Sequence, residues 1–314
     1  MKLSNLSNKA KLAMAAGVGV LVVGTGVGLY ATQFSSPKNV FLSRLQERTS
    51  AGKLTQDYEV ALKTSGNTNN SMIDGISING QSTTDGKNAE LTVNIGGLDR
   101  FGINVDEMHF ILYDNIIYIN ASVFFDFMTS RLGTDAKVAK DEYVALYDLV
   151  ETITSSDTYS HEIKSPNELN KEVSAAVGNY LKSLDGKKFL KEKDTDYVTL
   201  KLEEREIKEL FKTVLETMVN SKNYTGDKET IKDTLKTFDE DFDKAAKTVD
   251  LSVTISEGKE KGDSKAEFSY SSDEYGSGSV TVTTDGKDYQ SPEKPKKVIE
   301  RDQLEEKIQS AYSY

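Results

Sequence analysis

The first 36 residues contain an apolar stretch that constrains the whole chain. Residues 12–32 carry no charged side chain and are rich in Ala, Val, Gly and Leu, whereas Lys2, Lys9 and Lys11 precede them. About 20 residues, at a rise of ~1.5 Å each, span the roughly 30 Å hydrocarbon core of a bilayer. Because lysines favour the cytoplasmic side, we expect residues 1–11 in the cytoplasm, residues 12–32 as a single transmembrane anchor, and the body outside.

A cleaved signal peptide is the alternative interpretation, because it shares the basic start and the apolar stretch. The stretch is longer than a usual signal-peptide core and no Ala-x-Ala-like site follows it, although Gly26 and Gly28 supply small residues. We therefore expect a single-pass protein of the cell membrane, with secretion after cleavage as the alternative. The chain has no cysteine, which excludes attachment through a lipid-modified N-terminal cysteine.

The body of the chain is acidic. From residue 37 onward it holds 50 Asp and Glu against 36 Lys and Arg, a net charge of about −14. Such a charge opposes binding to nucleic acid or to an anionic bilayer. An exported protein without cysteine forms no disulfide, which fits a Gram-positive-type envelope better than a eukaryotic secretory pathway.

Alternation of apolar and polar residues predicts two groups of antiparallel strands. About five strands are expected between Leu54 and Asn120, with a reversal at Asp114-Asn115, and a second meander covers residues 251–284. Helical spacing predicts helices over 37–49, 121–132, 143–150, 166–184, 207–218 and 231–242, with a short one near Leu304. Segregated strands and helices indicate the α+β class. We expect one curved antiparallel sheet, a half-barrel, with helices packed on its concave face.

This order of elements resembles the curved half-barrel lipoproteins related to the LolA, LppX and LprG lipid carriers, and more closely their Gram-positive relatives of unassigned function. The resemblance lies in the hairpin of residues 110–120 (F-I-L-Y-D-N-I-I-Y-I-N), the 121–132 helix after it, and the terminal meander ending in S-P-E-K-P at 291–295. It implies one extracytoplasmic domain over residues 37–290 and a C-terminal extension over 291–314. Here the membrane span replaces the lipid-attachment cysteine of those lipoproteins.

The sequence offers no recognisable catalytic or metal-binding motif. His109 and His161 lie in different predicted elements, and His109 is expected on a strand face. Asp239, Asp241 and Asp243 match the start of a calcium loop, but Lys244 stands where such a loop needs glycine, so they are interpreted as a solvated helix face. We expect no enzyme activity, no cofactor and no metal.

Aromatic and sulfur-containing side chains suggest a site for an apolar ligand. The candidate residues are Met108, Phe110 and Leu112 on a strand, and Phe124, Phe127 and Met128 on the helix that follows. Either the helix simply packs in a core, or it forms a lid over the sheet that leaves a pocket for an acyl chain. The expected function is a binding module for lipid or another hydrophobic ligand. The alternative is a structural or protein-interaction domain of the envelope, with a filled core and a protein partner.

Overall fold

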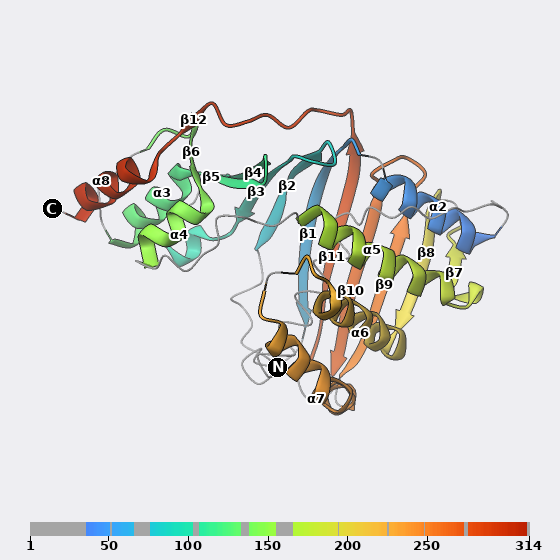
Figure 1. Ribbon diagram of the computed structural model, residues 1–314. Coiled ribbons are helices and arrows are strands. Elements are labelled where there is room, and N and C mark those ends of the chain that lie inside the picture. The colour runs from blue at the N-terminus through green and yellow to red at the C-terminus, as the bar shows by residue number, and fades with distance from the viewer. Residues whose placement is uncertain are drawn as a thin grey trace. The chain divides into compact units, whose positions relative to one another are not determined.

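In a computed structural model, the described part of the chain contains an open sheet of twelve strands, together with seven helices (Figure 1). The structure describes residues 36–50, 52–65, 76–102, 107–132, 138–154, 166–193, 195–224, 226–247, 249–272 and 276–312. The α+β class is therefore confirmed. The expected anchor over residues 12–32 lies outside the described residues, and no helix within them is long and apolar enough to cross a membrane.

Eight of the twelve strands, β1 to β5 and β9 to β11, form the two predicted meanders. They are β1 (Leu54–Ser65), β2 (Ser77–Thr84), β3 (Ala89–Gly96), β4 (Met108–Tyr113), β5 (Ile116–Asn120), β6 (Glu142–Ala145), β7 (Phe189–Lys191), β8 (Val198–Glu203), β9 (Asp250–Glu257), β10 (Ser264–Ser272), β11 (Gly276–Lys287) and β12 (Lys297–Val298). Their order in the sheet is β12-β6-β5-β4-β3-β2-β1-β11-β10-β9-β8-β7. The expected antiparallel sheet is mixed, because β12 pairs with β6 in parallel.

The helices begin and end where local sequence favours it. They are α2 (Pro37–Ser50), α3 (Ala121–Leu132), α4 (Leu146–Thr154), α5 (Pro166–Ser183), α6 (Glu204–Asn220), α7 (Lys228–Ala246) and α8 (Arg301–Tyr312), with short 3₁₀ turns η1 (Asp99–Phe101) and η2 (Gly186–Lys188). Proline occupies the first turn of α2 and α5, where its missing N–H costs no hydrogen bond. Glu203 and Glu206 form a capping box at the start of α6.

One predicted helix begins too early in the sequence. Tyr143 and Val144 were expected in a helix, but they lie in β6, and α4 begins only at Leu146. Both side chains favour extended backbone, and pairing of Val144 with Ile119 of β5 leaves Val144 fully buried. A tertiary contact therefore decides the conformation of these residues.

Two compact units divide the described residues, and each has its own core. Unit 1 comprises α2, α5, α6, α7, β7 to β11 and the second half of β1. Unit 2 comprises the first half of β1, β2 to β6, β12, α3, α4 and α8. The expected extension over 291–314 supplies β12 and α8 to unit 2, where Ile299 and Leu304 are buried.

The core of unit 1 is filled by side chains from its helices and strands. Helix α6 packs on β8 and β9, and α2 packs on β7, β8 and β9. The most buried members are Phe41, Leu181, Phe189, Leu200, Leu202 and Ile207, all at most 2% exposed. Dense packing of this kind is the ordinary interior of a globular unit.

A tight turn and three helices shape unit 2. Asp114 and Asn115 have φ of 51° and 66°, the left-handed conformation that a two-residue hairpin needs, so the predicted reversal is confirmed. Helices α3 and α4 pack on β5 and β6, and α8 packs on α4. Phe125, Val144, Leu149 and Leu304 form the centre of this core.

Candidate functional site

One face of the unit 2 sheet is apolar and only partly covered. Register places Leu91, Phe110, Ile119 and Val144 in one cross-strand row over β3 to β6, so all four side chains share a face. Exposure falls along this row, from 36% at Leu91 to 8% at Ile119 and 0% at Val144. Helices α3 and α4 cover the β5–β6 end of the row, and its β3 end is open.

Further apolar side chains lie beside this row. Met108 pairs with Val93, and Leu112 pairs with Ile117, so they stand on the same face as Phe110 and are half-buried. We call this surface the apolar face, and its members are Leu91, Val93, Met108, Phe110, Leu112 and Ile117. Half-buried apolar side chains on a sheet favour contact with another apolar group.

The six predicted ligand-binding residues fall into three groups. Met108, Phe110 and Leu112 lie together on the apolar face. Phe124 packs against the same cluster as Phe110, and Met128 is 2% exposed. Phe127 is 44% exposed, and Phe125, which the prediction left out, is the aromatic residue that fills the core.

The opposite face of the same strands carries a polar cluster. Nδ1 of His109 on β4 lies 2.6 Å from the Tyr143 hydroxyl on β6. Nε2 of His109 lies 2.7 Å from Oε1 of Glu90 on β3, although the oxygen is off the axis of a ring N–H bond, so the contact is close without being a linear hydrogen bond. Asn120 supports the row, because its Oδ1 accepts the backbone N–H of His109 at 2.8 Å.

Charge and burial set the protonation of this cluster. Contact with His109 lowers the pKa of the Glu90 carboxyl, and the backbone N–H of Glu293 lowers it further, against the opposing effect of burial. Burial raises the pKa of the Tyr143 phenol, and the nearby Glu90 carboxylate adds to that rise. Since a carboxylate only accepts hydrogen bonds, the N–H of Nε2 faces Glu90, and the Tyr143 hydroxyl faces Nδ1.

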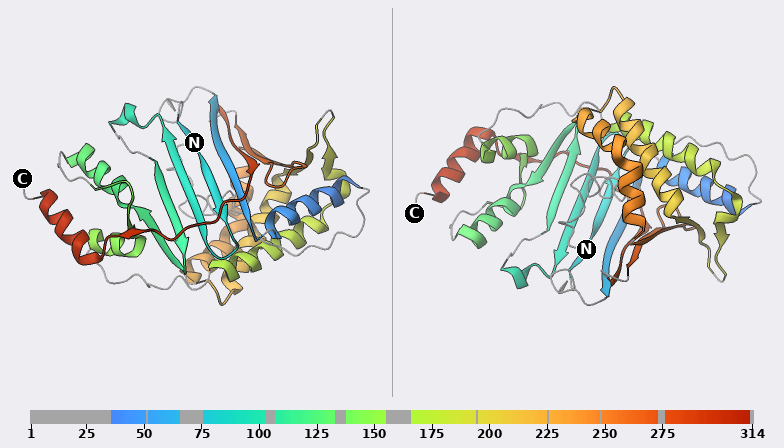
Figure 2. Two further views of the ribbon diagram at one scale, coloured as in Figure 1. Left: turned by 90° about the horizontal axis from the view of Figure 1, so that it is seen from above. Right: turned by 90° about the horizontal axis from the view of Figure 1, so that it is seen from below.

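A segment of the chain after β11 crosses this polar face. Residues 288–299, here called the strap, run over the strands of unit 2 (Figure 2). Gln290 binds through its backbone to the hydroxyls of Thr55 and Thr83 at 2.9 and 2.6 Å. Glu293 donates to Glu90, and the N–H of Ile299 donates to the carbonyl of Tyr143 at 2.7 Å. His109 thus contacts Glu90 and Tyr143, and each of these two residues also forms a hydrogen bond with the strap.

We expect Glu90→Gln to lower the free energy of unfolding by about 1 kcal/mol at pH 7, because a hydrogen-bonded charge is lost from a partly exposed position. A carboxyl with a lowered pKa in the fold stabilises above its unfolded pKa, and this stabilisation is lost as pH falls through the folded value. The difference from wild type should therefore shrink below about pH 4. Urea unfolding at both pH values measures it, with exposed Glu59→Gln of β1 as the control, and equal differences at both pH values contradict the prediction.

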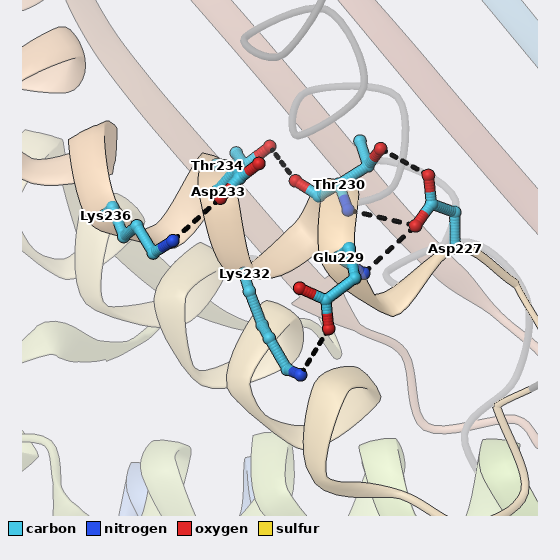
Figure 3. A network of polar contacts seen from close by, with 7 residues as sticks. All are labelled: Asp227, Glu229, Thr230, Lys232, Asp233, Thr234 and Lys236. Carbon is cyan, nitrogen blue, oxygen red and sulfur yellow. Dashed lines mark hydrogen bonds and ion pairs between the residues drawn. The ribbon is translucent and has the colours of Figure 1, made fainter.

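Other predicted features have ordinary structural roles. Asp239 and Asp243 on α7 pair with Lys208 and Lys212 of α6, which confirms the helix-face interpretation. Nearer the start of α7, Lys232 and Lys236 each pair with an acid three residues earlier (Figure 3). Within the described ranges, no group of three or more acidic or histidine side chains is placed to hold a metal ion. His161 lies outside those ranges.

The sequence did not predict which residues are neighbours across the strands. Leu91, Glu90 and Tyr143 belong to the two faces only through register, which joins residues far apart in the chain. The period-2 alternation of β3 does predict that Glu90 and Leu91 point to opposite faces. It does not identify their partners.

Comparisons with known protein families, with curated proteins and with solved structures give no match to this chain. The geometry and chemistry of the two faces therefore carry the functional proposal.

Proposed function

We propose that this chain is a membrane-anchored extracytoplasmic binding module that holds a lipid or another hydrophobic ligand against the apolar face of unit 2. In this proposal residues 12–32 are the uncleaved anchor and the chain catalyses no reaction. The proposal also takes the sheet to be a curved half-barrel with helices on its concave face, as in the lipid carriers that the sequence resembles.

The open end of the apolar row is the observation that carries the proposal. Leu91 is 36% exposed at the end of a row that is fully buried at Val144. The body around it is acidic and strongly polar, with a net charge of about −14 from residue 37 onward. An apolar surface kept open on such a body supports binding of an apolar group, since its desolvation is the available driving force.

A second candidate is a structural or protein-interaction domain of the envelope. The filled core of unit 1 favours it, because buried side chains from four helices and three strands leave that unit packed in the ordinary way. Two hollows on unit 1, of 510 and 610 Å³, are open and have charged and polar linings, which suits neither an acyl chain nor a lipid tail. In this candidate the apolar face contacts a protein.

Photocrosslinking tests the ligand and its place together. The full chain in its membrane is incubated with a photoactivatable fatty acid, irradiated and digested, and the labelled peptides are identified by mass spectrometry. We expect label within residues 89–120, separate from any label on the anchor. Leu91→Asp should reduce that label several-fold, because a carboxylate on the apolar face must be desolvated to admit an acyl chain.

Leu190→Asp is the matched control for this experiment. Leu190 is also an exposed leucine, at 48% against 36% for Leu91, but it lies on β7 of unit 1. This variant should keep the label within residues 89–120 at the wild-type level. Label confined to the anchor peptide in the wild type contradicts the lipid proposal and leaves the protein-interaction candidate.

A further inference from the structure

The start of α2 is fixed firmly within unit 1. Phe41 and Leu42 are 0% and 5% exposed in its core. Nζ of Lys38 donates to the carbonyl oxygens of Lys182 and Leu184, both at 2.6 Å, at the C-terminal end of α5. These carbonyls have no partner within a helix, so a cation is well placed there. The first turn of α2 and the end of α5 therefore form one rigid corner.

This corner lies close to the bilayer if residues 12–32 span it. Pro37 follows the end of the span at Thr32 by five residues. Five residues of extended chain reach at most about 18 Å, at roughly 3.3–3.6 Å each. The interfacial layer of a bilayer is itself several ångströms thick. The corner of unit 1 is thus held at the membrane surface by the length of the chain.

The segment beside this corner presents an exposed leucine. Phe189 of β7 is 2% exposed, and its ring contacts the ring of Phe41 edge-on at a centroid distance of 5.3 Å. Since successive side chains of a strand point to opposite sides, Leu190 points away from this contact and is 48% exposed. Anchored on one side by Phe189, β7 displays Leu190 beside the start of α2.

Four exposed lysines lie within eight residues of Leu190 in the sequence, besides Lys188, which pairs with Glu203 and Glu206. Lys182, Lys187, Lys191 and Lys193 are exposed, and none lies within 4.0 Å of a carboxylate among the described residues. The lysines of α7 in the same unit behave differently, since Lys232 and Lys236 are each paired with an acid (Figure 3).

The local charge at this corner is opposite in sign to the net charge of the whole body. Residues 182–196 contain five lysines and four acids, and Lys38 and Arg44 of α2 donate hydrogen bonds to this stretch. With Glu203 and Glu206, which both pair with Lys188, the corner holds seven basic side chains against six acidic ones, in a body of net charge about −14. Among the acids, Asp185 accepts the backbone N–H of Lys187, and Glu192 accepts the hydroxyl of Thr199.

We propose that residues 182–193 form a membrane-contact surface, on which the lysines meet anionic lipid headgroups and Leu190 enters the interfacial layer. The anchor supplies the attachment, and this surface fixes the orientation of unit 1 on the bilayer. Lysine stems lie along apolar surface while their ammonium groups stay in water, which suits the headgroup region. The inference rests on the membrane anchorage in the proposed function. It adds an anionic bilayer surface as the partner of residues 182–193.

A single fluorophore can test this contact, because the chain has no cysteine of its own. Leu190→Cys carries an environment-sensitive dye in the full chain, reconstituted into phosphatidylcholine vesicles with or without phosphatidylglycerol and a phospholipid nitroxide quencher. We expect quenching several-fold stronger in the anionic vesicles, and a loss of that difference at about 1 M salt, where the Debye length is ~3 Å. Lys191→Glu with Lys193→Glu should also remove the difference.

Lys236→Cys on α7 is the matched control, because α5 and α6 separate α7 from α2 in the helix layer of unit 1. Its dye should remain unquenched in every vesicle. A chain that floats with the vesicles after an alkaline wash, yet shows equally weak quenching at both positions, overturns the membrane contact and leaves the anchor standing. A chain that does not float overturns the anchorage, and with it this inference.

Discussion

We expect Arg48→Ala to lower the free energy of unfolding by about 3–5 kcal/mol, because it leaves a buried carboxylate without its partner. Arg48 of α2 and Glu257 of β9 meet at 2.8 Å, and their side chains are 6% and 2% exposed. Burial raises the pKa of Glu257, and Arg48 opposes that rise. Urea unfolding of the full chain in mild detergent, followed by circular dichroism, measures the loss.

The pH dependence of this variant has a defined sign. A carboxyl whose pKa is raised in the fold stabilises below its unfolded pKa, and this stabilisation is lost as pH rises through the folded value. Without Arg48 the pKa of Glu257 rises further, so the deficit of Arg48→Ala should be largest at pH 7 and smaller near pH 4. A loss under about 1 kcal/mol, the same at both pH values, contradicts a buried pair.

A double substitution distinguishes the effect of losing the ion pair from the effect of leaving one charge buried without a partner. Arg48→Met with Glu257→Leu removes both charges and keeps the volume apolar, so its stability should lie near or above that of wild type. Glu257→Leu alone leaves the Arg48 guanidinium buried and should again destabilise. Nε of Arg48 already has no hydrogen-bond partner within the described part of the chain, which favours an apolar replacement.

The second large effect is expected at Phe125 of α3. Phe125→Ala should lower the free energy of unfolding by about 3–5 kcal/mol, because it removes a ring that is 1% exposed in the core of unit 2. Phe127→Ala, two residues along the same helix, removes a ring that is 44% exposed and should cost under about 1 kcal/mol. Thermal unfolding of both variants provides the comparison.

This pair of variants tests the placement of α3 directly. The interpretation of α3 as a lid assigned Phe124, Phe127 and Met128 to an apolar pocket, but Phe127 faces solvent and Phe125 faces the core. A larger loss for Phe127→Ala than for Phe125→Ala contradicts the described orientation of the helix. Equal small losses indicate that α3 contributes little to unit 2.

Local sequence predicted much of the fold because its signals are local. Helix α3 begins and ends at the predicted Ala121 and Leu132, and the reversal at Asp114-Asn115 needs only two residues that tolerate positive φ. Tyr143 shows where local signals fail, because its spacing to Leu146 and Tyr147 fits a helix while its pairing partner Asn120 lies in β5. Short apolar segments are ambiguous between the two periods.

The amino-acid sequence by itself determined the α+β class, the two meanders, the acidic body and the absence of cysteine, since each follows from composition or from a period of a few residues. Only the tertiary structure decided which side chains meet. Register joined Glu90, His109 and Tyr143 across three strands, and the strap crossed over them from residues 288–299. The tertiary structure also leaves Leu91 exposed at one end of the apolar row and places Leu190 beside the start of α2. Such contacts depend on strand pairing and helix packing between distant segments, which no local pattern specifies.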